Sequence, residues 1–87
     1  MANHASAIKR HRQSLKRRTR NRAAKSRLRA LIRSVNEAVD AGDKAAAADK
    51  LQATSKALSK AASKGLLHSK NASRRTGRLA RKVAGIA

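Results

Sequence analysis

The sequence predicts an all-α fold: an up-down-up three-helix bundle with a long N-terminal helix that extends beyond the bundle. The 87 residues contain 20 alanines and no proline, and alanine, leucine, lysine and arginine are all strong helix formers. Apolar residues recur at helical spacing on one face of three successive segments. Gly42 and Gly65 separate these segments, and such short connections favour antiparallel neighbours. The length allows one domain, residues 1–87.

The first helix is predicted at about residues 7–41. Its apolar stripe consists of Ala24, Leu28, Leu31, Ile32, Val35, Ala38 and Val39. Continued toward the N-terminus, the stripe meets no apolar residue, and Ile8 and Leu15 lie on the opposite side. Residues 7–23 are therefore expected to project past the bundle as a helical arm of about 25 Å, at about 1.5 Å per residue. An isolated helix of this charge density would fray in water, so we expect the arm to become ordered on a partner.

The second and third helices are predicted at about residues 44–64 and 69–84, so that residues 24–84 form the bundle. Their stripes are Ala47, Leu51, Thr54, Leu58, Ala61 and Ala62, followed by Ala72, Thr76, Leu79, Ala80 and Val83, with Ile86 beyond. Asp43 and Ser69 are predicted as the N-caps, because their side-chain oxygens accept hydrogen bonds from first-turn amides. Leu66 and Leu67 are expected to close the end of the bundle.

Charge is distributed very unevenly along the chain. There are 23 Lys+Arg against 4 Asp+Glu, a formal net charge of +19. All four acids, Glu37, Asp40, Asp43 and Asp49, fall around the first turn, whereas 12 of the 25 residues from Lys9 to Arg33 are basic. The sequence predicts an acidic tip at one end of the bundle and a basic arm at the other. Because such a charge opposes compaction through self-repulsion, we expect the partner to be a polyanion.

Several function classes are excluded by what the sequence lacks. Without aromatic residues there is no base-stacking platform, and without cysteine there is no zinc ribbon or thiol nucleophile. No segment approaches the roughly 20 apolar residues of a membrane span. His4, His11 and His68 have no close carboxylate in sequence, so no metal site is expected. With no phosphate-binding glycine loop and no nucleophile beside a base, we expect neither an enzyme nor a cofactor or small-molecule substrate.

The basic segments favour contact with the phosphate backbone of a folded RNA. Arginine outnumbers lysine in the arm, and guanidinium groups suit bidentate phosphate contacts. A rod that is charged on nearly every side fits between several backbones better than in one DNA groove. The candidate RNA-binding residues of the first helix are Asn3, His4, Lys9, Arg10, His11, Arg12, Gln13, Lys16, Arg17, Arg18, Arg20, Asn21, Arg22, Lys25, Arg27 and Arg29. Those that follow are Lys56, Lys60, Lys64, His68, Lys70, Asn71, Arg74, Arg75, Arg78, Arg81 and Lys82, mostly opposite the apolar stripes.

Three stretches carry a resemblance to a known family. They are Met1-Ala2-Asn3 with the basic run Lys9 to Arg18, the turn Ala41 to Ala46, and Ala62 to His68 leading to Ala72-Ser73-Arg74 and Arg78-Leu79. In this order and at this spacing they resemble the bacterial small-subunit ribosomal protein S20 family over essentially all 87 residues.

The resemblance implies a non-catalytic three-helix protein of the cytoplasmic 30S subunit that binds 16S rRNA early in assembly. It implies a position that bridges the 5′ domain and the long stem near the 3′ end of the RNA, beside other small-subunit components. Matched positions place RNA contacts on the arm and at Lys64, His68, Lys70, Asn71 and Arg74.

A nucleoid-associated protein that compacts DNA is the alternative. That class would predict low-complexity repeats of Pro, Ala and Lys, or a dimerising core, and the sequence has neither. We therefore expect no homo-oligomer. The arm also lacks the sustained apolar face that a membrane-surface helix needs.

Overall fold

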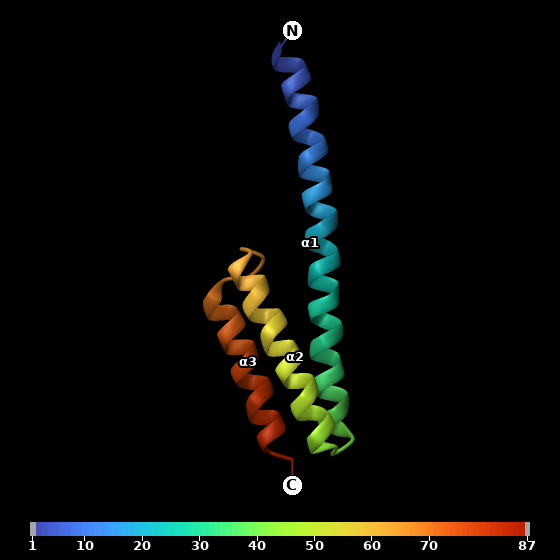
Figure 1. The fold of residues 1–87 in the computed structure, drawn as a ribbon, viewed down its shortest axis with the longest axis vertical. Helices are drawn as coiled ribbons and strands as arrows, with labels where there is room; N and C mark the ends of the chain where they lie inside the picture. The colour runs from blue at the N-terminus through green and yellow to red at the C-terminus, as the bar shows by residue number, and fades with distance from the viewer. Residues whose placement is uncertain (1, 87) are drawn as a thin grey trace.

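The protein is an up-down-up bundle of three helices with a long N-terminal extension, which confirms the predicted fold class. The computed structural model describes the backbone of residues 2–86 and the side chains of residues 5–86. Its elements are α1 (Ala2–Asp40), α2 (Lys44–Ser63) and α3 (Ser69–Ala84), with no strand among the residues described. Figure 1 shows α2 lying between α1 and α3, and the whole molecule extends 67 × 22 × 13 Å.

The helix boundaries agree closely with the sequence except at the N-terminus. There α1 begins at Ala2 rather than at about residue 7, since no proline or glycine precedes residue 42 to stop a helix. At the first turn Gly42 adopts a φ of +72° and at the second Gly65 adopts +80°, the left-handed conformation expected after a helix end.

One of the two predicted N-caps is confirmed and the other is wrong. Oδ1 of Asp43 accepts a hydrogen bond from the backbone N–H of Ala46 at 3.1 Å. The cap of α3 is His68 rather than Ser69, because Nδ1 of its ring accepts a hydrogen bond from the backbone N–H of Lys70 at 3.1 Å. With φ −69° and ψ 141°, His68 is the extended residue before the helix, and Ser69 is already the first helical residue.

The core consists of two apolar clusters stacked along the bundle. The cluster beside the first turn contains Val35, Ala38, Ala47, Leu79 and Val83. The cluster beside the second turn contains Leu28, Leu58, Ala61 and Ala72, and Leu66 and Leu67 pack against it as expected. The hydroxyl of fully buried Thr54, which lies on α2 between Leu51 and Leu58, donates to the carbonyl oxygen of Lys50 at 2.7 Å.

The third helix buries a narrower stripe than the sequence suggested. Ala72, Leu79 and Val83 are buried, but Ala80 is exposed, so its predicted place in the core is wrong. The physical reason is that α3 packs mainly against α2 and only lightly against α1. Ala80, which lies 100° around the helix from Leu79, therefore has no neighbouring helix to pack against.

Candidate nucleic-acid interface

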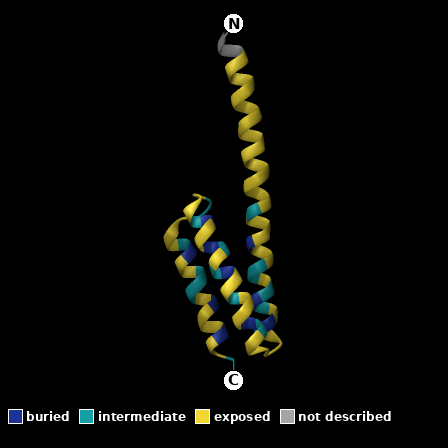
Figure 2. Cartoon of the chain, viewed as in Figure 1, coloured by how far each residue is buried: buried dark blue, intermediate teal, exposed yellow. Residues whose placement is uncertain are grey.

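The N-terminal arm stands clear of the bundle. Every side chain from residue 5 to residue 23 is exposed, and Ala24 is the first that is half-buried, as the unbroken yellow of the upper part of α1 shows in Figure 2. Ile8 and Leu15, at 45% and 47% exposure, are the only exposed large apolar side chains of the described residues. The boundary between arm and bundle falls where the apolar stripe of α1 ends.

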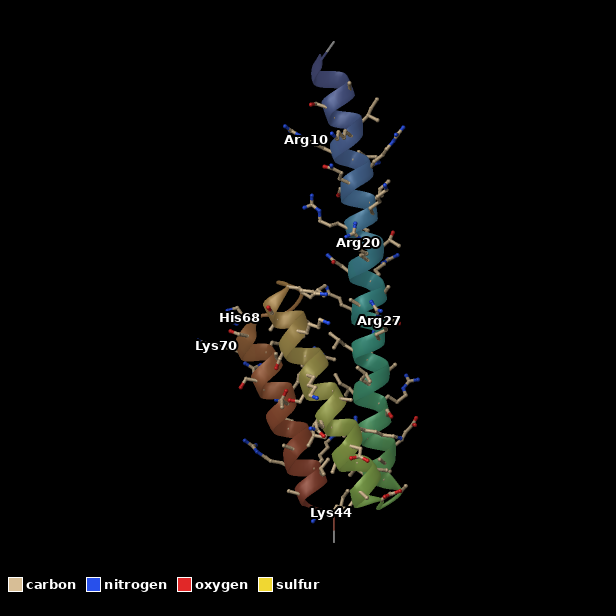
Figure 3. All side chains as sticks on the ribbon, in the orientation of Figure 1. Arg10, Arg20, Arg27, Lys44, His68 and Lys70 are labelled. Atoms are coloured by element: carbon tan, nitrogen blue, oxygen red, sulfur yellow. The ribbon has the colours of Figure 1, made fainter. Side chains whose placement is uncertain are left out.

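Positive charge surrounds the arm. Eight lysines and arginines lie between Lys9 and Arg22, and their side chains extend from both sides of α1 in Figure 3. A shallow polar hollow on one side is lined by Ser14, Arg17, Arg18, Asn21, Arg22 and Lys25. Several guanidinium groups can therefore bind one phosphate together, with amide or hydroxyl groups supplying further hydrogen bonds. Ser14 was absent from the sequence-predicted set, because a lone serine among cations gives no signal of its own.

The bundle carries a second group of cations. Six of the candidates on α2 and α3 that the sequence placed opposite the core are exposed, namely Lys56, Lys60, Lys70, Arg74, Arg78 and Arg81. Lys64, which caps α2, is exposed as well. Lys82 is also exposed, and its Nζ donates to Oδ1 of Asn36 on α1 at 3.2 Å, which ties α3 to the long helix.

Arg75 and Asn71 are less exposed than the sequence predicted. Arg75 was placed on the outer face of the third helix, but it is half-buried beside α1. Its Nε donates to Oδ1 of Asn71 at 3.1 Å, one turn earlier on α3. Lys25, Leu28, Arg29 and Leu67 lie around it in a small hollow. The side-chain oxygen of Asn71 is thus occupied within the protein, where it holds the guanidinium of Arg75.

His68 is exposed at the start of α3, beside Lys70 (Figure 3). Because Nδ1 accepts the capping hydrogen bond, the ring proton of neutral His68 is on Nε2, which can donate to a phosphate or a 2′-hydroxyl. His11 and Gln13 are exposed on the arm. The side chains of Asn3 and His4 lie outside the described residues.

The four carboxylates lie at the end of the bundle opposite the arm. Glu37, Asp40, Asp43 and Asp49 are all exposed around the first turn, which Figure 1 places at the far end of the molecule from the N-terminus. The molecule therefore has the predicted electrical polarity, with an acidic tip and a basic arm and bundle surface. A polyanion is attracted to one end and repelled from the other.

Two further observations concern the described residues. No three His, Cys, Asp or Glu side chains among them gather closely enough to ligate a metal ion. None of their helices combines the length and the apolar character needed to cross a membrane.

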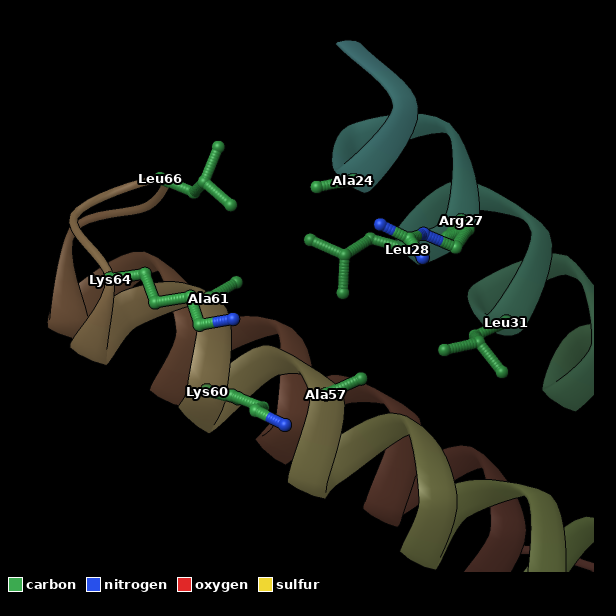
Figure 4. Close-up of a pocket in the computed structure, with 9 residues that line it drawn as sticks. All are labelled: Ala24, Arg27, Leu28, Leu31, Ala57, Lys60, Ala61, Lys64 and Leu66. Carbon is green, nitrogen blue, oxygen red and sulfur yellow. The ribbon is translucent and has the colours of Figure 1, made fainter. Parts of the chain in front are cut away.

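A hollow between α1 and α2 was not foreseen from the sequence. It has a volume of about 250 Å³ and is lined by Ala24, Arg27, Leu28, Leu31, Ala57, Lys60, Ala61, Lys64 and Leu66 (Figure 4). The leucines and alanines form its floor, and the remaining lining residues are Arg27 on α1 and Lys60 and Lys64 on α2 and at its C-cap. Its existence depends on how far the two helices diverge, which periodicity does not specify.

Comparison with known proteins gives a consistent result. The family model described as ribosomal protein S20 matches residues 2–84. The chain is 55% identical over 86 residues to the small ribosomal subunit protein bS20 of Desulfovibrio desulfuricans, covering 99% of this chain and 97% of the relative. Proteins of the same name from Beutenbergia cavernae and Mycolicibacterium smegmatis are 50% and 52% identical, covering 99% and 92% of this chain and 100% and 93% of those proteins.

Proposed function

The chain belongs to the ribosomal protein S20 family, and from this premise we propose that it binds 16S rRNA directly through the phosphate backbone and stabilises its folded form during assembly. Members of the family are structural proteins of the small ribosomal subunit and not enzymes. The protein is accordingly a component of the 30S subunit in the cytoplasm.

The fully exposed arm is the observation that carries the proposal. Every side chain from residue 5 to residue 23 is exposed, and these residues include eight of the lysines and arginines of the chain. A helix with such a surface is stabilised where phosphates surround it and release their counterions. A crevice between RNA backbones provides these conditions along the whole length of the arm.

The proposed division of labour follows the geometry. The arm, residues 7–23, inserts between RNA backbones, and the bundle, residues 24–84, supplies cations that contact a second RNA segment. The molecule is 67 Å long, so that arm and bundle reach separate helices of a folded RNA. We assign these two contacts to the 5′ domain and to the long stem near the 3′ end of 16S rRNA.

The proposed contact residues are those predicted from the sequence, with two changes of role. Arg75 acts from a half-buried position, and Asn71 acts by orienting Arg75. The remaining arm and bundle cations contact phosphate directly, and His68 donates through Nε2. The protein acts as a monomer, because the apolar stripes of its three helices pack against one another within the bundle.

The test is a comparison of nucleic acids at several salt concentrations. The purified full chain is titrated with deproteinised 16S rRNA, with a 23S rRNA fragment of equal length, and with duplex DNA. We expect 16S rRNA to bind most tightly, with a slope of log affinity against log salt of about −7 to −9 if roughly 8–10 duplex phosphates are neutralised. Fragments containing the 5′ domain alone or the 3′ stem alone should each bind more weakly than the whole RNA.

Two results would contradict the proposal. The first is equal affinity for 16S rRNA and duplex DNA at moderate salt, which is the behaviour of a nucleoid protein. The second is that, at moderate salt, the protein dissociates from small subunits and cosediments with chromosomal DNA.

A further inference from the structure

The hollow between α1 and α2 combines an apolar floor with a cationic rim. Leu28 and Leu31 line the space from α1 and Leu66 lines it from the second turn, and Arg27, Lys60 and Lys64 complete its lining (Figure 4). We propose that this hollow receives one unstacked nucleotide of the bound RNA, whose base or ribose lies on the leucines while its phosphates contact the three cations. This inference rests on the proposed RNA-binding function and adds a base-binding subsite to it.

The hollow is open because small residues line the place where the helices separate. Figure 1 shows α1 and α2 close together at the first turn and further apart toward the second. Across this gap Ala24 on α1 faces Ala57 and Ala61 on α2, and none of these side chains is long enough to fill it. The core beneath is complete, since Leu58 is fully buried and Leu28 is 6% exposed.

The floor explains why the ligand includes a base or ribose and not a phosphate alone. Phosphate contacts need only cations and hydrogen-bond donors, whereas leucine side chains are stabilised when apolar or aromatic surface covers them. Unpaired bases in folded RNA are bound by side-chain stacking, and arginine guanidinium planes serve this purpose in place of aromatic rings. Arg27, which lines the hollow beside Leu28, supplies such a plane in a chain that has no aromatic residue.

Size and charge narrow the choice of ligand. The volume of about 250 Å³ lies below the roughly 300–1,000 Å³ that is typical of drug-sized ligands, which suits a single base or ribose. The rim contributes three positive charges and the lining contains no carboxylate. An unstacked nucleotide matches this pattern, because it offers one flat apolar face between two negative phosphates.

The position of the hollow links it to the arm. Lys25 lines the polar hollow of the arm together with Arg17 and Asn21. Leu28, three residues later and therefore on the same side of α1, lines the apolar hollow. An RNA strand that follows the arm therefore reaches the apolar hollow at the point where the arm joins the bundle.

The decisive variant is Ala57→Leu, which fills the hollow from α2 without changing charge or helix propensity appreciably. The matched control is Ala53→Leu, the same change at an exposed position one turn earlier on the same helix and outside the hollow. Both proteins are checked for helicity and thermal unfolding and are then titrated with deproteinised 16S rRNA. We expect Ala57→Leu to bind roughly 5- to 150-fold more weakly, as for the loss of one stacked base, and Ala53→Leu to bind like the unmodified chain.

A second measurement separates base from phosphate contacts. Ala57→Leu should leave the slope of log affinity against log salt unchanged, whereas Lys60→Gln should reduce its magnitude by about 1. Base-specific chemical probing of the RNA should reveal an unpaired base that the unmodified chain protects and Ala57→Leu does not. Backbone protection along the arm should persist in both.

The subsite is overturned if Ala57→Leu and Ala53→Leu bind 16S rRNA equally and protect the same bases. It is also overturned if Ala57→Leu binds naked rRNA normally but is lost from assembled subunits, since the occupant is then a protein segment. Failure of the unmodified chain itself to prefer 16S rRNA would refute the underlying function, and that result does not depend on any variant.

Discussion

Oδ1 of Asn71 accepts a hydrogen bond from Nε of Arg75, one turn further along α3, at 3.1 Å. Both side chains are half-buried, and Arg75 lies against Leu28 and Leu67 beside Lys25 and Arg29. The bond fixes the plane of the guanidinium while leaving its terminal nitrogens available. A guanidinium held in this way loses little rotamer entropy when it binds a phosphate.

Replacement of Asn71 should therefore act through Arg75. We expect Asn71→Ala to weaken 16S rRNA binding by about 0.5–1 kcal/mol, and to have almost no further effect when Arg75→Ala is already present. The control pair is Gln13→Ala with Arg75→Ala, whose effects should add because Gln13 lies far away on the arm. Titration of the four proteins of each cycle measures the coupling. Additivity of Asn71→Ala and Arg75→Ala would show that Asn71 contacts the RNA independently.

A leucine in the core and a leucine on the arm should respond very differently to the same substitution. Leu58 is fully buried, whereas Leu15 on the arm is 47% exposed. We expect Leu58→Ala to lower the free energy of unfolding by about 2–5 kcal/mol, and Leu15→Ala to change it by less than about 0.5 kcal/mol. Urea unfolding followed by circular dichroism compares the two variants. A comparable loss in Leu15→Ala would mean that the arm packs against the bundle in solution.

The sequence was most informative where one physical rule decides the outcome. The positive φ of Gly42 and Gly65, the Asp43 cap and the buried stripe of α2 all follow from local chemistry and periodicity. The place of Ala80 was wrong because it depends on how closely α3 approaches α1, which is a property of the assembled bundle.

The remaining errors have the same origin. Serine is a more common N-cap residue than histidine. The backbone of the second turn nevertheless puts His68 in the extended conformation, and Nδ1 of its ring accepts the capping hydrogen bond. The half-buried position of Arg75 and the hollow beside Leu31 arise from the angles between helices. Residue types therefore predicted which cations lie on the surface, with Arg75 as the exception. Tertiary packing decides which of them are oriented by a neighbour and which line an apolar hollow.

Three glycines offer a test of backbone conformation alone. A Cβ on Gly42, Gly65 or Gly77 would meet no atom of a packing neighbour within 4 Å, so only the local backbone conformation matters. Gly42 and Gly65 have positive φ, whereas Gly77 lies inside α3 without it. We expect Gly42→Ala and Gly65→Ala each to destabilise the protein by about 1–2 kcal/mol, and Gly77→Ala to stabilise it by about 0.5–1 kcal/mol. Thermal unfolding of the three variants checks the signs, and a loss of stability in Gly77→Ala would contradict the assignment.

Charge reversal on the arm should weaken RNA binding without affecting the bundle. Arg17 and Arg18 are exposed and line the polar hollow of the arm. We expect Arg17→Glu with Arg18→Glu to weaken 16S rRNA binding at least about tenfold and to reduce the magnitude of the salt slope by about 2, with unchanged thermal unfolding. Lys44→Glu with Lys50→Glu is the control, because it changes the net charge equally at exposed positions beside the acidic tip. Equal losses in the two double variants would indicate that only net charge matters.

The arm should also be the least protected part of the free protein, even though α1 is a continuous helix from Ala2 to Asp40. Amides before Ala24 are held only by hydrogen bonds along the helix, since every side chain from residue 5 to residue 23 is exposed. Amides around Leu28 and Val35 belong to turns that are packed into the two clusters. Local opening of the arm therefore exposes no buried side chain, and we expect its amides to exchange much faster than those that follow. Hydrogen exchange followed by NMR should show the change near Ala24 in the free chain, and slower exchange throughout the arm once 16S rRNA is bound. Equal protection from residue 9 to residue 35 without RNA would contradict this, because the arm would then have a stabilising contact that its exposed surface does not reveal.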